Sequence, residues 1–268
     1  MRDGAEGTAD PSARSSVNSY SRRRVEGLRP PKAFSWRRYA IARVRNDRLI
    51  SREGACPNIA FQRSRSSSIP SFDRLAISDA KTLTILGAGV QGKSHLATVP
   101  LTRDFTAIRI ASRDRDHAAA LASTDPRCVV IPSFEEAIHG ADVVCCCTDA
   151  ADPITRYEWF DPGTHVTSVG GTFGPELDAE TIRLARVFVE WNGAAQNPPP
   201  AGAHELQGID PAAITEIGEV IAGLKPGRES SEEITVYKST GSGFEDAVVA
   251  QIVYRAALEA RIGTEVEV

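Results

Sequence analysis

Short apolar runs alternate with helix-compatible stretches along the chain beyond residue 81. The first run, Thr82–Leu86, contains β-branched residues and has the composition of a strand buried on both faces. Further strands are expected at residues 106–111, 128–131, 141–147, 164–169 and, as the last of the series, 187–190, with helices at residues 93–99, 115–123 and 133–139. Strands that are separated by helices predict an α/β fold with a doubly wound parallel sheet.

A glycine-rich turn follows the first predicted strand directly. Its G-x-G-x-x-G pattern, residues 87–92, stands between that strand and a helical stretch. In such a turn the first glycine permits a tight bend, the second lets a pyrophosphate approach the backbone, and the third lets the helix pack close to the strand. Free N–H groups at the helix N-terminus favour the phosphates. The pattern therefore predicts a Rossmann-like dinucleotide site at Gly87, Ala88, Gly89, Val90 and Gln91.

The end of the second predicted strand bears on which dinucleotide binds. Folds that prefer NAD usually have an acidic residue there, which accepts a hydrogen bond from the ribose 2′-hydroxyl. This strand ends instead in Ser112 and Arg113, which can donate to a 2′-phosphate and pair with it. NADP(H) is therefore expected in preference to NAD(H). The alternative is that Arg113 is only a solvated residue and that Asp114 contacts the ribose.

Further cofactor contacts are expected where two later strands end. In an open α/β sheet the ligand lies beyond the carboxyl ends of the strands. Thr148 follows the predicted strand at 141–147, and Val169 and Gly170 stand at the end of the strand at 164–169. These three residues are therefore predicted to line the cofactor.

Three adjacent cysteines, Cys145, Cys146 and Cys147, suggest a metal site at first sight. Neighbouring residues on a strand point to opposite faces, so the three thiols cannot all reach one ion. The chain also has no C-x-x-C or H-E-x-x-H spacing. We expect buried thiols and no metal site.

Residues 1–74 differ from the remainder in charge and in pattern. They hold 16 basic and 7 acidic residues, a net charge of +9, whereas the remainder has a net charge of −13. Their one short apolar stretch, residues 39–44, cannot bury a core. The segment is interpreted as a poorly ordered stretch or one that no longer encodes a domain. A basic arm for nucleic acid lacks the aromatic residues of a recognition pattern, and a transit peptide disagrees with Asp3, Glu6 and Asp10.

The composition also bears on where the protein acts. No apolar run approaches the roughly 20 residues that a membrane span needs. The first ten residues contain no apolar segment of the kind found in secretory signals. A cytoplasmic protein with no membrane partner is therefore expected.

Several segments, taken together and in this order, resemble the ornithine cyclodeaminase/mu-crystallin family. They are residues 83–96, 159–170, 214–223 and 234–243 with the helical stretch that follows, and the resemblance covers residues 75–268. It implies a homodimer with a dinucleotide domain at residues 75–232, and a strand and helix at 233–268 that return toward a separate substrate domain. The shared chemistry is hydride transfer between a nicotinamide and the Cα of an imino or amino acid. The resemblance also places the turn that begins at Lys238 close to the cofactor.

The sequence departs from the family pattern in two places. Cyclodeaminases carry an Asp shortly after the strand at 164–169, whereas this chain has Thr172 near that position. Threonine cannot act as a base at neutral pH, which favours a reductase over a cyclodeaminase. Residues 1–62 do not resemble the family's substrate domain, and from this region we carry over Arg63 alone, as a contact for the substrate carboxylate. The N-terminus is either a divergent arm or out-of-frame coding ahead of an intact remainder.

These observations lead to one main hypothesis with two alternatives. The hypothesis is an NADP(H)-dependent reductase or dehydrogenase of a cyclic imino acid or an amino acid, with an incomplete or atypical N-terminal substrate domain. The alternatives are an NADP(H)-binding protein without catalytic activity and an ornithine cyclodeaminase-type lyase. The expected partners are a small imino or amino acid and, if the N-terminal region folds, a second copy of the chain. Nucleic acid is not expected as a partner, because the folded part is acidic.

Overall fold

The computed structural model describes residues 69, 71–171, 173–241 and 243–263. The predictions made for residues 1–68, including the substrate contact assigned to Arg63, lie outside the described residues. The same holds for Thr172, on which the argument against a cyclodeaminase rests.

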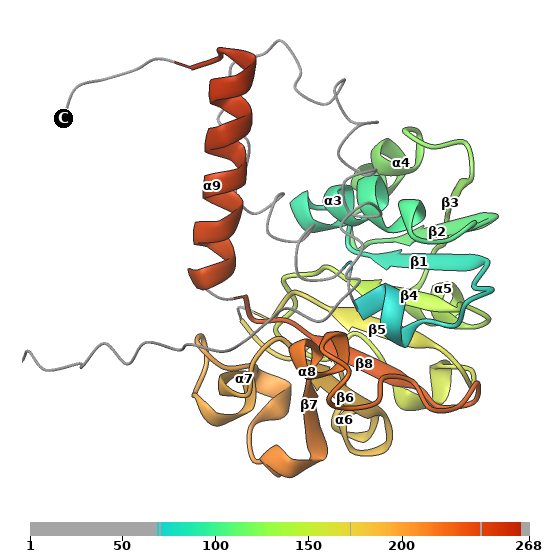
Figure 1. The fold of residues 1–268 in the computed structure, drawn as a ribbon. Helices are drawn as coiled ribbons and strands as arrows, with labels where there is room; N and C mark the ends of the chain where they lie inside the picture. The colour runs from blue at the N-terminus through green and yellow to red at the C-terminus, as the bar shows by residue number, and fades with distance from the viewer. Residues whose placement is uncertain (1–68, 70, 172, 242, 264–268) are drawn as a thin grey trace, which may run out of the picture. The chain divides into compact units, whose positions relative to one another are not determined.

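A single sheet of eight parallel strands organises the described part of the chain (Figure 1). In chain order the strands are β1 (Thr82–Leu86), β2 (Ala107–Ala111), β3 (Cys128–Val130), β4 (Val143–Cys146), β5 (His165–Ser168), β6 (Arg186–Val189), β7 (Ile214–Glu216) and β8 (Thr235–Lys238). Their order across the sheet is β3-β2-β1-β4-β5-β8-β6-β7, and every neighbouring pair is parallel. The predicted fold class, a doubly wound parallel sheet of the Rossmann type, is confirmed.

The strand predictions were correct in place but not in number. Each predicted strand forms within two residues of its expected bounds. Beyond the strand at 187–190, β7 was not predicted, whereas β8 forms the strand that was expected within residues 233–268. β7 has three residues, too few to show a periodic pattern. β8 lies between β5 and β6, where Val236 pairs with Val166 on one side and Val187 on the other.

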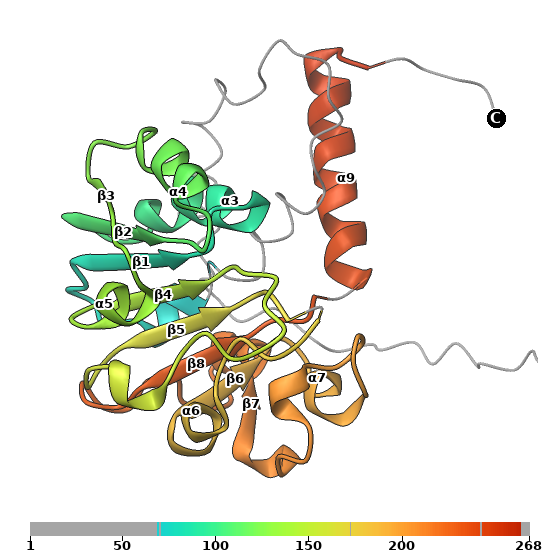
Figure 2. The ribbon, with the colours of Figure 1, turned by 180° about the vertical axis from the view of Figure 1, so that it is seen from behind.

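Helices cover both faces of this sheet (Figures 1 and 2). The longer helices are α3 (Val90–Thr98), α4 (Arg115–Ala122) and α9 (Gly243–Ala260). The shorter ones are α5 (Phe134–Ile138), α6 (Ala179–Leu184), α7 (Gly193–Gln196) and α8 (Ile217–Ile221), with 3-10 turns η1 (Val99–Leu101), η2 (Tyr157–Trp159), η3 (His204–Leu206) and η4 (Pro211–Ala213). None of the described helices has the length and apolarity that a membrane span needs.

Three clusters of buried apolar side chains pack on the sheet in the described part of the chain, and the smallest joins Leu75 to Phe188, Ile217, Val220 and Tyr237. Of the two larger cores, the first joins the apolar side chains of α3, α4 and Phe72 to β1, β2 and β4, and the second joins α5, α6 and α7 to β4, β5, β6 and β8. Cys145 and Cys147 belong to the first core and Cys146 to the second, as expected for neighbours on a strand. Burial raises the pKa of all three thiols, so they are neutral packing groups.

α9 is one helix of 18 residues, as expected for the helix within residues 233–268, and the apolar residues Phe244, Val248, Ile252 and Ala256 recur at every fourth position along it. Its first three repeat positions nevertheless remain 78%, 41% and 55% exposed, and Val249 alone among the described residues of this helix is buried. The expectation that this helix returns toward a substrate domain stays a prediction.

The helical residues 71–75 are fastened to the sheet by one guanidinium group. Arg228 donates hydrogen bonds to the backbone oxygens of Leu75 (2.5 Å) and Gly163 (2.9 Å) and to Oγ1 of Thr235 (3.0 Å). The same Thr235 oxygen lies 2.9 Å from Nδ1 of His165, and the rings of His165 and Phe72 stand perpendicular to each other with their centroids 5.4 Å apart. His165 is therefore enclosed between the sheet and this helix, beside a fixed positive charge.

We expect the free energy of unfolding to fall as the pH is lowered below 6.5. Burial, and after it the charge of Arg228, lowers the pKa of His165 from 6.5 to about 3, and burial also lowers the pKa of His95. The unfolded chain therefore takes up protons at a pH where the folded chain does not. The contribution of neutral His165 to the free energy of unfolding is fully present above pH 6.5. It is lost as the pH falls toward 3, by about 1.4 kcal/mol per pH unit.

Urea unfolding at pH 7.5 and at pH 5.5 tests this expectation. The variant His165→Gln should show a drop in unfolding free energy between the two pH values that is about 1.4 kcal/mol smaller than that of the unaltered protein. His117→Gln is the matched control, because the side chain of His117 is 73% exposed. Equal drops in all three proteins would show that His165 does not titrate in this way.

Candidate functional site

The turn after β1 lies where the strand order reverses, with β2 on one side of β1 and β4 on the other. Gly87 has φ +101°, a left-handed conformation that favours glycine, and a Cβ there would stand 2.6 Å from the carbonyl oxygen of Cys147. Its N–H donates to the carbonyl of Ala111, and the N–H of Cys147 donates to that of Leu86, both at 2.8 Å. The turn is thus fixed between the ends of β2 and β4, at the place where ligands of open α/β sheets bind.

The other two glycines of the turn have opposite surroundings. A Cβ on Gly92 would lie 2.0 Å from the carbonyl oxygen of Gly87, so the helix packs too closely there for any other residue. A Cβ on the exposed Gly89, the N-cap of α3, would meet nothing within 4 Å. The first N–H groups of α3 have no acceptor within the helix. Open space in front of unpaired donors is what a pyrophosphate requires.

The remaining residues predicted for this turn differ in exposure. Ala88 is buried and packs in the core on the α3 side of the sheet. Val90 is exposed and Gln91 half-buried, both in the first turn of α3. The structure therefore places the predicted turn residues together at the carboxyl edge of the sheet.

A buried carboxylate joins the carboxyl ends of β4 and β5. Oε1 of Glu176 accepts from N (2.6 Å) and Oγ1 (2.7 Å) of Thr148, and Oε2 accepts from Oγ of Ser168 (2.7 Å) and N of Gly170 (2.9 Å). The Glu176 side chain is fully buried. It holds two of the predicted cofactor residues, Thr148 and Gly170, in a fixed relation to each other.

The ammonium group of Lys238 lies at the end of β8, against the end of β5. Its Nζ donates to Oγ of Ser168 (2.9 Å) and to the carbonyl of Gly170 (2.8 Å), and lies 3.0 Å from Oε1 of Glu205. The side chains of Lys238 and Glu205 are each 1% exposed. The ammonium of Lys238 thus donates two hydrogen bonds to groups at the end of β5 and forms a buried ion pair with Glu205.

A third carboxylate connects β6 to the turn after β8. Glu190 accepts from Oγ of Ser239 (2.5 Å) through Oε2, and from N (2.8 Å) and Oγ1 (3.1 Å) of Thr240 through Oε1. Nε1 of Trp191 donates to the same Thr240 hydroxyl at 3.2 Å. The residues that follow Lys238 are therefore held by side chains from the neighbouring strand.

Ser112 and Arg113 follow β2, next to the glycine turn. Ser112 is half-buried and Arg113 is exposed. Asp114, the alternative contact for a ribose, is the N-cap of α4, and its Oδ1 accepts from the N–H of His117 at 3.0 Å. This hydrogen bond lowers the pKa of Asp114. The side chain of Asp114 therefore already has a structural role.

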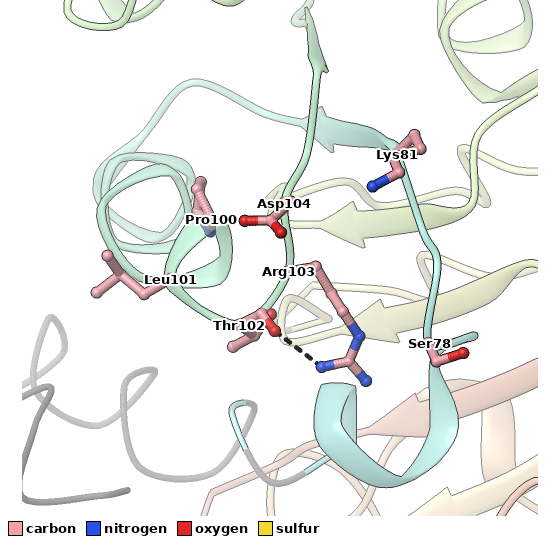
Figure 3. A pocket seen from close by; sticks show the side chains of 7 residues that line it. All are labelled: Ser78, Lys81, Pro100, Leu101, Thr102, Arg103 and Asp104. Atoms are coloured by element: carbon pink, nitrogen blue, oxygen red, sulfur yellow. Dashed lines mark hydrogen bonds between the residues drawn. The ribbon is translucent and has the colours of Figure 1, made fainter.

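Two pockets lie at opposite edges of the sheet. The larger, about 370 Å³, is lined by Ser78, Lys81 and residues 100–104 (Figure 3). Lys81 immediately precedes β1, so this pocket is at the amino edge, away from the glycine turn. The smaller, about 90 Å³, is at the carboxyl ends of β5 and β8 and is lined by Val169, Gly170, Gly171, Pro200, Gly202, Ala203, Lys238, Ser239 and Thr240. The predicted residues Val169, Gly170 and Lys238 meet in this smaller pocket.

Sequence reasoning did not find the three carboxylates Glu176, Glu190 and Glu205. None belongs to a motif with fixed spacing, and each acts on backbone or side chains that are distant in sequence. The available signal was weak: Glu190 ends a predicted strand, and Glu176 follows another by a few residues.

Comparison with known proteins agrees with this geometry. The sequence profile of the ornithine cyclodeaminase/mu-crystallin family matches residues 66–261. The chain is 41% identical over 177 residues to the ketimine reductase mu-crystallin of Mus musculus, covering 64% of this chain and 54% of that protein. It is 35% identical over 209 residues to a Δ1-pyrroline-2-carboxylate reductase of Bacillus cereus, covering 72% and 62%. The chain thus spans little more than half the length of the curated relatives it matches.

Solved structures show the same relationship. The Δ1-pyrroline-2-carboxylate reductase of Thermococcus litoralis, in complex with NADH and L-proline, superposes with a TM-score of 0.73 and 31% identity over 78% of this chain and 68% of that one. The iminosuccinate reductase of Paracoccus denitrificans, in complex with NAD+, gives 0.69 and 26% over 79% and 67%. Since the family profile covers most of the chain and the fold agrees, this chain belongs to the ornithine cyclodeaminase/mu-crystallin family.

Proposed function

We propose that the chain binds NADP(H) at the carboxyl edge of its sheet and acts as a reductase or dehydrogenase of cyclic imino acids or amino acids. The observation that carries the proposal is the open position of Gly89 in front of the first N–H groups of α3. The substrate class follows from the relatives, which include a ketimine reductase and Δ1-pyrroline-2-carboxylate reductases.

The residues present fit a dinucleotide along the whole edge. A bound nicotinamide would supply the hydride. In this proposal the turn from Gly87 to Gln91 holds the pyrophosphate, and Thr148, Val169 and Gly170 line the path toward the nicotinamide. Lys238 serves the cofactor indirectly, because its ammonium group holds the carbonyl of Gly170 in place. The proton and the substrate carboxylate must be handled by other groups.

We expect NADPH to bind more tightly than NADH, and Arg113→Ala to reduce this preference. The variant removes a charge-assisted contact to the 2′-phosphate worth on the order of 1.5–3 kcal/mol. Fluorescence titrations with both dinucleotides measure the two affinities. Arg183→Ala is the matched control, because the side chain of Arg183 is 66% exposed and lies on α6. Equal affinities in the unaltered protein would show that Ser112 and Arg113 do not contact the phosphate.

The second candidate is a dinucleotide-binding protein with little or no turnover. It is favoured by Lys238, the one cation that lines the small pocket among the described residues, since its ammonium already donates to Ser168 and Gly170 and pairs with Glu205. A substrate carboxylate would therefore need a cation from outside these residues. Arg63, which the resemblance suggested, lies outside the described residues.

We expect the chain to bind NADPH but to oxidise it slowly or not at all with cyclic imino acids. Catalysis needs the reacting carbon held close to the nicotinamide, and a displacement of about 1 Å can cost on the order of 100-fold in rate. NADPH oxidation is followed by absorbance with Δ1-pyrroline-2-carboxylate and related imines. Turnover near a typical enzyme rate of about 10 per second would contradict the expectation. Release of ammonia from L-ornithine in the same sample would favour the lyase.

A further inference from the structure

Buried carboxylates outnumber cations at the small pocket. Glu176 and Glu205 both contact the hydrogen-bonded group formed by Lys238, Ser168 and Gly170, and Lys238 is its one ammonium. Each oxygen of Glu176 accepts from a backbone N–H, which requires lone pairs on both oxygens. Glu190, bonded to the neighbouring Ser239, adds charge of the same sign.

Glu205 is the member of this group whose carboxylate oxygens accept no hydrogen bond from the described residues. Its Oε1 forms an ion pair with the ammonium of Lys238, and neither of its two buried oxygens has a hydrogen-bond partner among the described residues. Its Oε2 lies 3.8 Å from the place where a Cβ on Gly171 would stand, and Gly171 lines the pocket. An unpaired buried carboxylate oxygen is unfavourable unless a positive or hydrogen-bond-donating group comes close to it.

We infer that Glu205 makes this end of the cofactor site prefer the oxidised dinucleotide. The inference rests on the proposed function, in which Val169 and Gly170, at the end of β5, line the path toward the nicotinamide. The oxidised nicotinamide ring carries a positive charge and the reduced ring carries none. A buried negative excess therefore stabilises the oxidised ring more than the reduced one. It also favours the loss of hydride from the reduced ring, because positive charge develops there during transfer.

The test compares the affinities of NADP+ and NADPH in the full chain. In Glu205→Gln, which keeps the shape and removes the charge, the dissociation constant of NADP+ should rise on the order of tenfold relative to that of NADPH. Calorimetry measures NADP+ and fluorescence measures NADPH. Glu205→Asp should retain the original ratio because it keeps the charge. Glu232→Gln, at an exposed residue, should also retain it.

Each possible result of these affinity measurements either supports or overturns the inference. An unchanged ratio in Glu205→Gln, or an equal loss of both affinities, would overturn the inference and leave the proposed function standing. If Glu205→Gln does not fold, Lys238→Gln replaces it, because removal of the cation must shift the ratio the opposite way, toward NADP+. A ratio that does not shift toward NADP+ in that variant would overturn the inference. Failure of the unaltered protein to bind either dinucleotide would remove the proposed function and the inference together.

Discussion

Replacing Gly89 with alanine is expected to weaken NADPH binding about 100-fold, which corresponds to about 2.7 kcal/mol. A methyl group at this position would meet no protein atom within 4 Å, and φ of Gly89 is −76°, which alanine adopts readily. The folded chain should therefore tolerate the substitution. In the proposed complex, however, the methyl group occupies the space through which the pyrophosphate approaches the backbone.

Two other glycines provide the controls. Gly218, in α8, also has nothing within 4 Å of its Cβ position, so Gly218→Ala should leave NADPH affinity unchanged and should not lower stability. Gly92→Ala should destabilise the fold itself, because its Cβ would collide with the carbonyl of Gly87. Dinucleotide titrations and urea unfolding of the three variants measure both quantities. Unchanged NADPH affinity in Gly89→Ala would show that the phosphates bind elsewhere.

Glu176→Gln is expected to lower the free energy of unfolding by about 3 kcal/mol, because the new amide NH2 group is buried facing a backbone N–H group and neither has an acceptor. The amide oxygen can still accept from one strand end, but the amide NH2 must face either the N–H of Thr148 or that of Gly170. The ends of β4 and β5 should separate, and this separation should lower the affinity for NADPH. Urea unfolding and NADPH titration of the same preparation measure the two effects.

The matched control for this change is Glu180→Gln. Glu180 is exposed on α6 and pairs with Arg183 at the surface, a kind of contact worth about 0–1 kcal/mol. If Glu176→Gln is no less stable than Glu180→Gln, the buried carboxylate does not hold the two strand ends together.

The sheet was predictable because its strands carry a strong local signal. Thr82–Leu86 is a short, largely apolar strand that is followed directly by the G-x-G-x-x-G turn and then by a helix. This strand–turn–helix order defines the dinucleotide turn. The sequence could not show that β8 enters between β5 and β6. That position depends on Val236 fitting between Val166 and Val187, which are distant along the chain. Topology of this kind is decided by packing and not by local pattern.

The candidate site divides in the same way. The residues of the glycine turn belong to a contiguous motif with a physical role for each position, so the sequence alone groups them as a candidate site. Glu176 and Glu205 were missed because their roles appear only when separate strand ends meet. Lys238 was identified by resemblance as a residue near the cofactor. Its hydrogen bonds add that it acts on the backbone of Gly170.

The central claim is that the carboxyl edge of this sheet binds a dinucleotide through the turn at Gly87–Gly92. A titration of the folded chain with NADPH, followed by the change in nicotinamide fluorescence, tests it most directly. The account predicts saturable binding of one NADPH per chain, tighter than NADH and lost in Gly89→Ala. A folded chain that shows no saturable binding of NADPH or NADH would contradict it.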